Sequence, residues 1–171
     1  MDKEYLGTGR PYYNAVCLIL CSACGAGLLS KAPGTWGTLV GVIIHVFIAT
    51  FASNDVYKPL LFLVFLFSCI FGYLLVPWAK RYWQEEDPKH FVLDEVAGYL
   101  FVPVMLPSPD NLWFVVLSSF LLFRVFDITK TPPARYIDKN MKGGFGIFAD
   151  DVVSGFYTAV CIRVVMMLEL L

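Results

Sequence analysis

Pairs of acidic side chains occur where polar segments of this chain give way to apolar ones. Asp94 and Glu95 lie in the stretch VLDEVAG, and Asp150 and Asp151 end the glycine-rich stretch GGFGIFADD. Adjacent carboxylates repel each other unless a cation lies between them. Carboxylate oxygens without clustered histidine or cysteine are ligands that suit Mg²⁺, so the two pairs predict a magnesium site.

Each pair also allows a purely structural interpretation. Acidic residues in the first turn of a helix are stabilised by its dipole, and an aspartate just before a helix is a common N-cap. Adjacent residues of a helix point about 100° apart, so one member of a pair can face the bundle while the other faces water. The preceding glycines would let Asp150 and Asp151 turn toward a shared ion, and which of them binds metal and which caps the helix is left open.

A basic and acidic stretch, FRVFDITK, ends another apolar segment. Arg124 and Asp127 are three residues apart and therefore share one face of a helix. Charged side chains at the end of an apolar segment are costly to bury unless they have a partner or a ligand. A structural ion pair and a functional site are therefore both open interpretations. The prolines of residues 131–133 predict the end of this helix. Lys130 and Arg135 flank the break, where both could reach a phosphate.

A glycine turn precedes the second apolar segment. Gly34 and Gly37 alternate with two hydroxyl side chains, Thr35 and Thr38, and a helix is expected from about Leu39. The free N–H groups of a helix that follows glycines suit an anion such as phosphate. A plain turn with Thr38 as the N-cap is the alternative.

Taken together, these stretches predict phosphoryl chemistry. Metal-bound carboxylates, cationic side chains and a glycine turn are what positioning and charge neutralisation of a phosphoryl group require. We expect the metal to be held by Asp94, Glu95, Asp127, Asp150 and Asp151. We expect Arg124, Lys130 and Arg135 to stabilise negative charge, and the Gly34–Thr38 turn to contact the phosphate. The chain has neither the Cys-x5-Arg loop nor the Asp-x-Asp pair that some phosphoryl-transfer enzymes use.

The elements that position these residues are expected to lie in a membrane. The chain has 171 residues, of which 58% are hydrophobic and only 16% charged, and its mean hydropathy is +0.66. Soluble domains have about 45–50% apolar and about 25% charged residues. The net charge of -1 and the lack of a basic stripe exclude a nucleic-acid partner. The five cysteines are expected to be free thiols, and His45 a hydrogen-bonded core residue.

Helices are expected throughout, as a compact all-α bundle in one domain, 1–171, with a polar N-terminal segment, 1–11. A span needs about 20 apolar residues, and only some of the segments reach that length, so three to five spans are expected, the other helices being short or re-entrant. The apolar segments are 12–29, 39–52, 59–79, 96–109, 111–123 and 152–171.

The charged loops predict the orientation of the bundle. Residues 30–38, 80–95 and 124–151 hold most of the lysines and arginines, while the opposite connections hold Lys58 and little else. Basic loops stay in the cytoplasm, so the candidate site is expected on the cytoplasmic face. The N-terminal cations would lie outside if 12–29 spans, and inside if that helix is peripheral.

Four stretches together resemble the phosphatidylglycerophosphatase A family. They are APGTWGT (32–38), VLDEVAG (92–98), FRVFDITK (123–130) and GGFGIFADD (143–151), and the resemblance runs from about residue 25 to 165. It implies Mg²⁺-dependent removal of the terminal phosphate of phosphatidylglycerophosphate at the bacterial inner membrane, giving phosphatidylglycerol. It also implies an all-helical fold. A proline common after the lysine of the third stretch is Thr131 here.

Two other functions are open at this point. A phospholipid headgroup transferase would also use membrane carboxylates and metal, but would need a nucleotide. A small membrane transporter would place acids in the middle of its spans, whereas these acids lie at segment ends. The sequence leaves open the oligomeric state, the number of metal ions, the acyl-chain preference, and whether water attacks directly or through a phospho-aspartyl intermediate.

Overall fold

The described part of the chain is entirely helical, which confirms the expected fold class. A computed structural model describes residues 11–141 and 143–168. Within these ranges no strand occurs. The elements are α1 (Pro11–Cys21), the 3-10 helix η2 (Ala26–Leu28), α2 (Pro33–Phe51), α3 (Asn54–Trp83), α4 (Leu93–Met105), α5 (Leu112–Thr129), α6 (Ala134–Asn140) and α7 (Gly144–Leu168).

Four of these helices, α2, α3, α5 and α7, are long and apolar enough to cross a membrane. This number lies within the expected three to five spans. Of the two alternatives for residues 12–29, the structure favours a first helix that does not span, because α1 has 11 residues and ends at Cys21. The N-terminal cations, Lys3 and Arg10, lie outside the described residues, which begin at Pro11.

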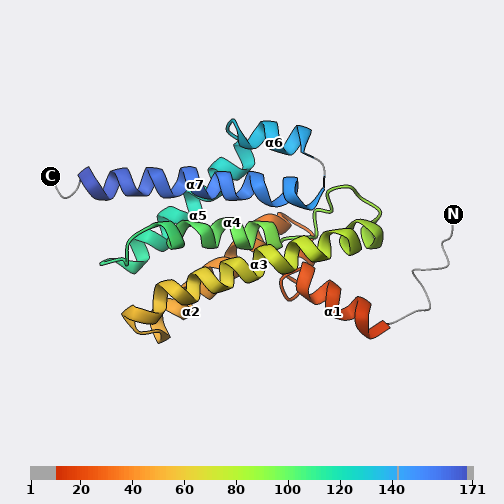
Figure 1. The fold of residues 1–171 in the computed structure, drawn as a ribbon, viewed down its shortest axis with the longest axis horizontal. Helices are drawn as coiled ribbons and strands as arrows, with labels where there is room; N and C mark the ends of the chain where they lie inside the picture. The colour runs from red at the N-terminus through yellow and green to blue at the C-terminus, as the bar shows by residue number, and fades with distance from the viewer. Residues whose placement is uncertain (1–10, 142, 169–171) are drawn as a thin grey trace.

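Helix α4 is the centre of the bundle. It has 13 residues, about 20 Å of helix, which is too short to span. It packs against α2, α3, α5 and α7 (Figure 1). Its side chains are buried on nearly every side, and Tyr99 and Leu100 are completely covered. The helix can be apolar all round because it meets protein rather than lipid.

The far end of α4 is closed by a lysine. Lys58 of α3 donates a hydrogen bond of 2.6 Å to the carbonyl oxygen of Pro103 and another to that of Leu106. The last carbonyls of a helix have no partner within the helix, and unpaired backbone groups are costly at membrane depth. Lys58 is the cation that the sequence places in a loop on the side opposite to the basic loops. Its hydrogen bonds allow α4 to end inside the bundle.

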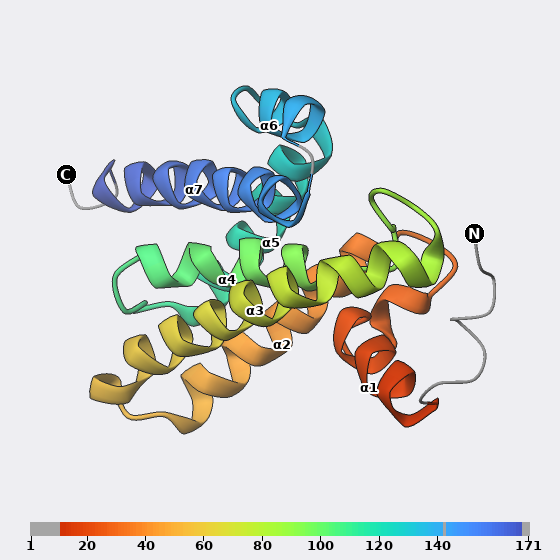
Figure 2. The ribbon, with the colours of Figure 1, turned by 45° about the vertical axis from the view of Figure 1, so that its right-hand side comes forward.

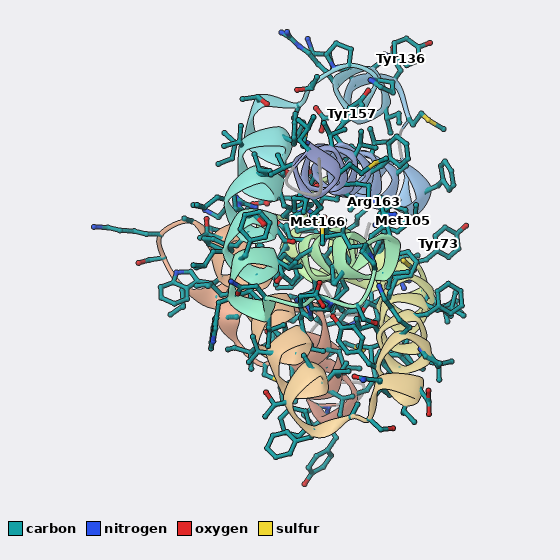
Figure 3. The ribbon with its side chains drawn as sticks, turned by 90° about the vertical axis from the view of Figure 1, so that its left-hand side faces the viewer. Tyr73, Met105, Tyr136, Tyr157, Arg163 and Met166 are labelled. Carbon is teal, nitrogen blue, oxygen red and sulfur yellow. The ribbon has the colours of Figure 1, made fainter. Side chains whose placement is uncertain are left out.

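The charged loops gather at one end of the bundle, as the sequence predicts. Helices α2, α4 and α7 begin at this end, and α3 and α5 finish there (Figure 1). Helix α6 follows the end of α5 and packs on α7, on the side away from α4 (Figure 2). Tyr157 of α7 donates a 2.7 Å hydrogen bond to the carbonyl oxygen of Pro132, holding the turn before α6 against α7 (Figure 3).

Two helix starts differ from the expectation. Helix α2 begins at Pro33, not near Leu39, because proline suits the first helical position. The expected turn at Gly34–Thr38 is therefore helical, and Thr38 is not an N-cap. Helix α7 begins at Gly144, so Asp150 lies almost two turns inside it. The idea that Asp150 or Asp151 caps the last helix is wrong.

Candidate functional site

Three acidic side chains meet at the charged end of the bundle. Asp94 and Glu95 come from the first turn of α4, and Asp151 comes from the second turn of α7. One carboxylate oxygen from each lies within 4.8 Å of the others. Asp94 and Asp151 are buried. The structure thus brings Asp151 to a pair of acids that lies more than fifty residues before it in the sequence.

Two glycines bring α4 and α7 close enough for this meeting. Gly98 lies one turn after Asp94, and Gly155 lies one turn after Asp151. A Cβ added at Gly155 would overlap the carbonyl oxygen of Gly98, and a Cβ added at Gly98 would lie 2.9 Å from that of Asp151. Helices that cross through small residues approach at backbone distance. The space beside Gly98 is filled by α7 and the ring of Phe123.

The acids of α4 are held in an environment that disfavours their charge. Burial raises the pKa of Asp94 well above its usual range, and repulsion from Glu95 and Asp151 adds to this. Burial also raises the pKa of Glu95, to about 7, although Arg124 opposes the shift. A cation bound among these oxygens would relieve both the repulsion and the lost hydration.

Arg124 supports the cluster from behind. Its Nη1 forms an ion pair with Asp127 and a 3.4 Å hydrogen bond to Oγ1 of Thr38. A Cβ added at Gly34 would overlap the carboxylate of Glu95 and lie 3.3 Å from the same Nη1. The first turns of α2 therefore pack directly on Glu95 and Arg124. The structural interpretation of Arg124 and Asp127 as an ion pair is confirmed.

Asp150 is paired with a different cation. Lys130, the residue that ends α5, lies 2.6 Å from Oδ2 of Asp150 and 2.7 Å from Oδ1 of Asp138. Burial lowers the pKa of Lys130, but its bonds to the two aspartates outweigh this, so the net direction is upward. Because Asp150 and Asp151 are adjacent in a helix, one faces Lys130 while the other faces the acids of α4.

A cavity of about 320 Å³ opens onto these groups. All the predicted acids, Asp94, Glu95, Asp127, Asp150 and Asp151, line it together with Lys130. Three further lysines line it, Lys80, Lys89 and Lys139, which the sequence marks only as charges of the basic loops. Lys80 and Lys89 belong to the loop 80–95 and Lys139 to the loop 124–151, and no regular spacing links them to the acids. The only feature of the sequence that could have predicted these lysines at the site is that they belong to the basic loops.

Several predicted phosphate contacts do not reach the cavity. Among the described residues that line it, none comes from α2, and neither Arg124 nor Arg135 appears. Gly37 packs against Val92, and Thr38 donates to the carbonyl oxygen of Gly34. Thr35 is half-buried in α2, while Arg135 is exposed on α6. Phosphate contacts by Gly34, Thr35, Gly37, Thr38 and Arg135 stay predictions.

The donor set fits a hard divalent cation. The cluster offers carboxylate oxygens, the ligand type of Mg²⁺. Oε2 of Glu95 and Oδ1 of Asp150 are buried and have no hydrogen-bond partner among the described residues. Buried oxygens without a partner are costly and are explained by a bound ion or water. Asp127 and Asp150 line the cavity but are engaged by cations, so their place as ligands stays a prediction.

The family model for phosphatidylglycerophosphatase A matches residues 19–166. This chain belongs to the phosphatidylglycerophosphatase A family. Phosphatidylglycerophosphatase A of Haemophilus influenzae is 34% identical over 144 residues, which cover 84% of this chain and 85% of the relative. That of Escherichia coli is 34% identical over 157 residues, covering 92% and 84%. The family is one of phosphatases, and the matched region holds every residue of the acidic cluster.

A third relative in the comparison carries a different name. A putative phosphatidylinositol-3-phosphatase of Bacteroides thetaiotaomicron is 32% identical over 161 residues, which cover 91% of this chain and 95% of the relative. No solved structure matches the chain significantly. Membership of the phosphatidylglycerophosphatase A family therefore rests on sequence, and the resemblance seen in the four stretches is confirmed.

Proposed function

We propose that the protein is a Mg²⁺-dependent phosphatase that removes the terminal phosphate of phosphatidylglycerophosphate to give phosphatidylglycerol. Water adds to phosphorus, the ester oxygen leaves with a proton, and inorganic phosphate is released. The observation that carries the proposal is the meeting of Asp94, Glu95 and Asp151 within 4.8 Å beside a lysine-lined cavity. The named relatives supply the choice of substrate.

Asp94, Glu95 and Asp151 would hold the metal. Bound Mg²⁺ supplies charge neutralisation and polarisation of the phosphoryl oxygens. The chain itself supplies the cations that receive the phosphate, with Lys130 in the cavity wall and Lys80, Lys89 and Lys139 around it. Positioned cations stabilise the charge that spreads over a phosphoryl group during transfer.

Arg124 and Asp150 are proposed to position other groups of the site rather than to contact the phosphate themselves. Arg124 fixes Asp127 and lies against Glu95, so it sets the direction of those carboxylates from behind the cavity wall. Asp150 accepts from Lys130 through Oδ2 and keeps Oδ1 free of protein partners among the described residues. A free buried acceptor beside the cavity suits the orientation of a water molecule.

The site is proposed to face the cytoplasm at a bacterial inner membrane. The lysines and arginines of the described loops gather at the cavity end of the bundle, which is the arrangement of cytoplasmic loops. The named relatives are bacterial. A lipid with its acyl chains among the spanning helices would present its phosphate at this end.

The test measures phosphate release from phosphatidylglycerophosphate by the protein purified in detergent. Release is expected with Mg²⁺, and its loss in EDTA should be reversed by added Mg²⁺. Asp94→Asn and Asp151→Asn are expected to lower the rate about 100-fold or more, because each removes a charge from the buried cluster. Asp55→Asn, which alters an exposed acid at the start of α3, is the matched control.

Full activity in both cluster variants would contradict the metal-site assignment. Release that requires a nucleotide would favour the headgroup transferase instead. Release of phosphate that persists in EDTA would support the phosphatase activity but contradict its dependence on Mg²⁺.

A second candidate function is hydrolysis of a phosphorylated inositol lipid. The name of the Bacteroides relative favours it. The same acids and lysines would serve either phosphomonoester, so the two are separated by the headgroup. Phosphate release from phosphatidylinositol 3-phosphate, measured beside phosphatidylglycerophosphate under identical conditions, decides which lipid has the higher kcat/KM.

A further inference from the structure

An apolar groove of about 620 Å³ runs between α3 and α7. The α3 side is formed by Cys69, Ile70, Tyr73 and Leu74, and Ile137 of α6 also lines the groove. From α7 it is lined by Gly144, Phe145, Phe148, Ala149, Val152 and Val153. Both long helices are candidate membrane spans, so the groove is formed by segments that are expected to lie in the bilayer. Tyr73 projects from the outer side of the bundle (Figure 3).

The groove and the cavity lie on opposite faces of the same turns of α7. Gly146, Ile147 and Asp150 line the cavity, while Phe145 and Phe148 line the groove. The faces of a helix are about 10 Å apart, and the two hollows also share neighbours in α6, where Ile137 lines one and Asp138 the other. A single lipid molecule is long enough to occupy both.

The glycines at the start of α7 shape the rim between the two. Gly143 lines the cavity and Gly144 the groove. Gly143 has a φ of +108°, which side chains rarely adopt, and a Cβ at Gly144 would come within 2.9 Å of the Tyr73 ring. The start of α7 therefore packs directly on Tyr73 of α3, at the point where the lining of the cavity and that of the groove meet along the chain.

The depth of the groove matches an acyl chain attached to a headgroup in the cavity. Lys80 of α3 lines the cavity, and Leu74 lies six residues before it on the same helix. At 1.5 Å per residue Leu74 is about 9 Å below Lys80, and Cys69 about 16 Å below. The groove thus begins just beneath the charged end and continues toward the middle of the membrane.

We propose that this groove between α3 and α7 binds an acyl chain of the lipid whose phosphate enters the cavity. The inference rests on the proposed lipid phosphatase function. An apolar groove offers a lipid chain little more than its neighbours do, because lipid tails are equally apolar. Its contribution is orientation: a chain held here fixes the glycerol backbone above the start of α7 and directs the terminal phosphate toward Lys130 and the acids.

Photo-crosslinking tests the groove without relying on turnover. A phosphatidylglycerophosphate carrying a diazirine in one acyl chain is mixed with the protein in detergent micelles, irradiated, and the labelled peptides are mapped by mass spectrometry. Label is expected in residues 69–74 and 144–153, and excess unlabelled phosphatidylglycerophosphate should remove it while phosphatidylcholine should not. Label spread evenly over the spanning helices, or unaffected by competition, would mean surrounding lipid only and would overturn the proposal.

Filling the groove provides the second test. Ile70→Trp and Leu74→Trp place a larger side chain in it, and Ile43→Trp places one at an exposed position of α2. The groove variants are expected to lose about tenfold in kcat/KM on the long-chain lipid, an effect of about 1.4 kcal/mol, while Ile43→Trp stays at the wild-type value. Equal rates in all three would count against the groove, as would a change in oligomeric mass showing that a second copy covers it.

The two proposals fail differently. If no phosphate is released but unlabelled lipid competes away the label in the groove, the phosphatase proposal is contradicted and the lipid groove is supported. If phosphate is released normally but unlabelled lipid does not reduce the label, only the groove proposal is contradicted.

Discussion

Gly98 of α4 and Gly155 of α7 are in backbone contact one helical turn below Asp94 and Asp151. The contact sets the separation of the two helices at the level of the acids. Since 3.6 residues complete a turn, residues four apart lie on the same side of a helix. The small residues therefore decide where the carboxylates meet, although they bind nothing themselves.

Gly155→Ala should lower phosphatase activity although it changes no charged residue. The new Cβ would overlap the carbonyl oxygen of Gly98, and such overpacking typically costs about 1–3 kcal/mol and shifts the backbone. The expected result is a lower melting temperature together with a loss of kcat about tenfold or larger. Val160→Leu, at an exposed position of the same helix, is the control. Unchanged kcat with a lowered melting temperature would show that the crossing supports only the fold.

Mg²⁺ should raise the melting temperature of the wild-type protein. The buried acids repel one another without a cation, and a ligand that binds only the folded state stabilises it by about 2.7 kcal/mol at 100 times its Kd. The shift, followed by circular dichroism in detergent, should shrink strongly in Glu95→Gln. The Asp55→Asn protein should keep it. An equal shift in Glu95→Gln would place the ion elsewhere.

Arg124→Lys should not replace arginine. The guanidinium reaches Asp127, Thr38 and the neighbourhood of Glu95 at once, and a lysine ammonium cannot reproduce this planar set of donors. Activity is expected to fall about tenfold to 100-fold, as for residues that orient metal ligands. A positioning role also predicts weaker binding of Mg²⁺, measured by titration of the melting temperature. Loss of rate with unchanged Mg²⁺ affinity would instead indicate that Arg124 contacts the phosphate.

His45→Phe should destabilise the bundle without removing activity from the folded fraction. His45 is fully buried, and its ring nitrogens lie 2.8 Å from the hydroxyl of Tyr57 and 3.1 Å from that of Tyr99. Phenylalanine would leave both hydroxyls without this partner, at about 1–3 kcal/mol for each buried group. The triple variant with Tyr57→Phe and Tyr99→Phe should recover part of the loss. Thermal unfolding monitored by circular dichroism checks both results.

The sequence alone determined the class of fold and predicted the type of ligand atoms at the candidate site. Apolar composition predicted a helical membrane bundle, and the paired acids predicted a cluster of oxygen ligands; the helices confirm the first, and the meeting of Asp94, Glu95 and Asp151 agrees with the second. Both inferences depend only on residue types, which can be read from the sequence without knowing how the helices pack. His45 was likewise expected as a hydrogen-bonded core residue and is one.

Only the tertiary structure decided which charged residues share a surface. The sequence analysis placed Asp150 at a helix start and Gly34 in a turn, but α7 begins at Gly144 and α2 at Pro33, so both residues lie inside helices. Lys80 and Lys139 reach the cavity because separate helices end at the same side of the bundle. Such meetings depend on how helices cross, here through Gly98 and Gly155. A crossing is set by contacts between distant segments, which residue spacing along one segment does not contain.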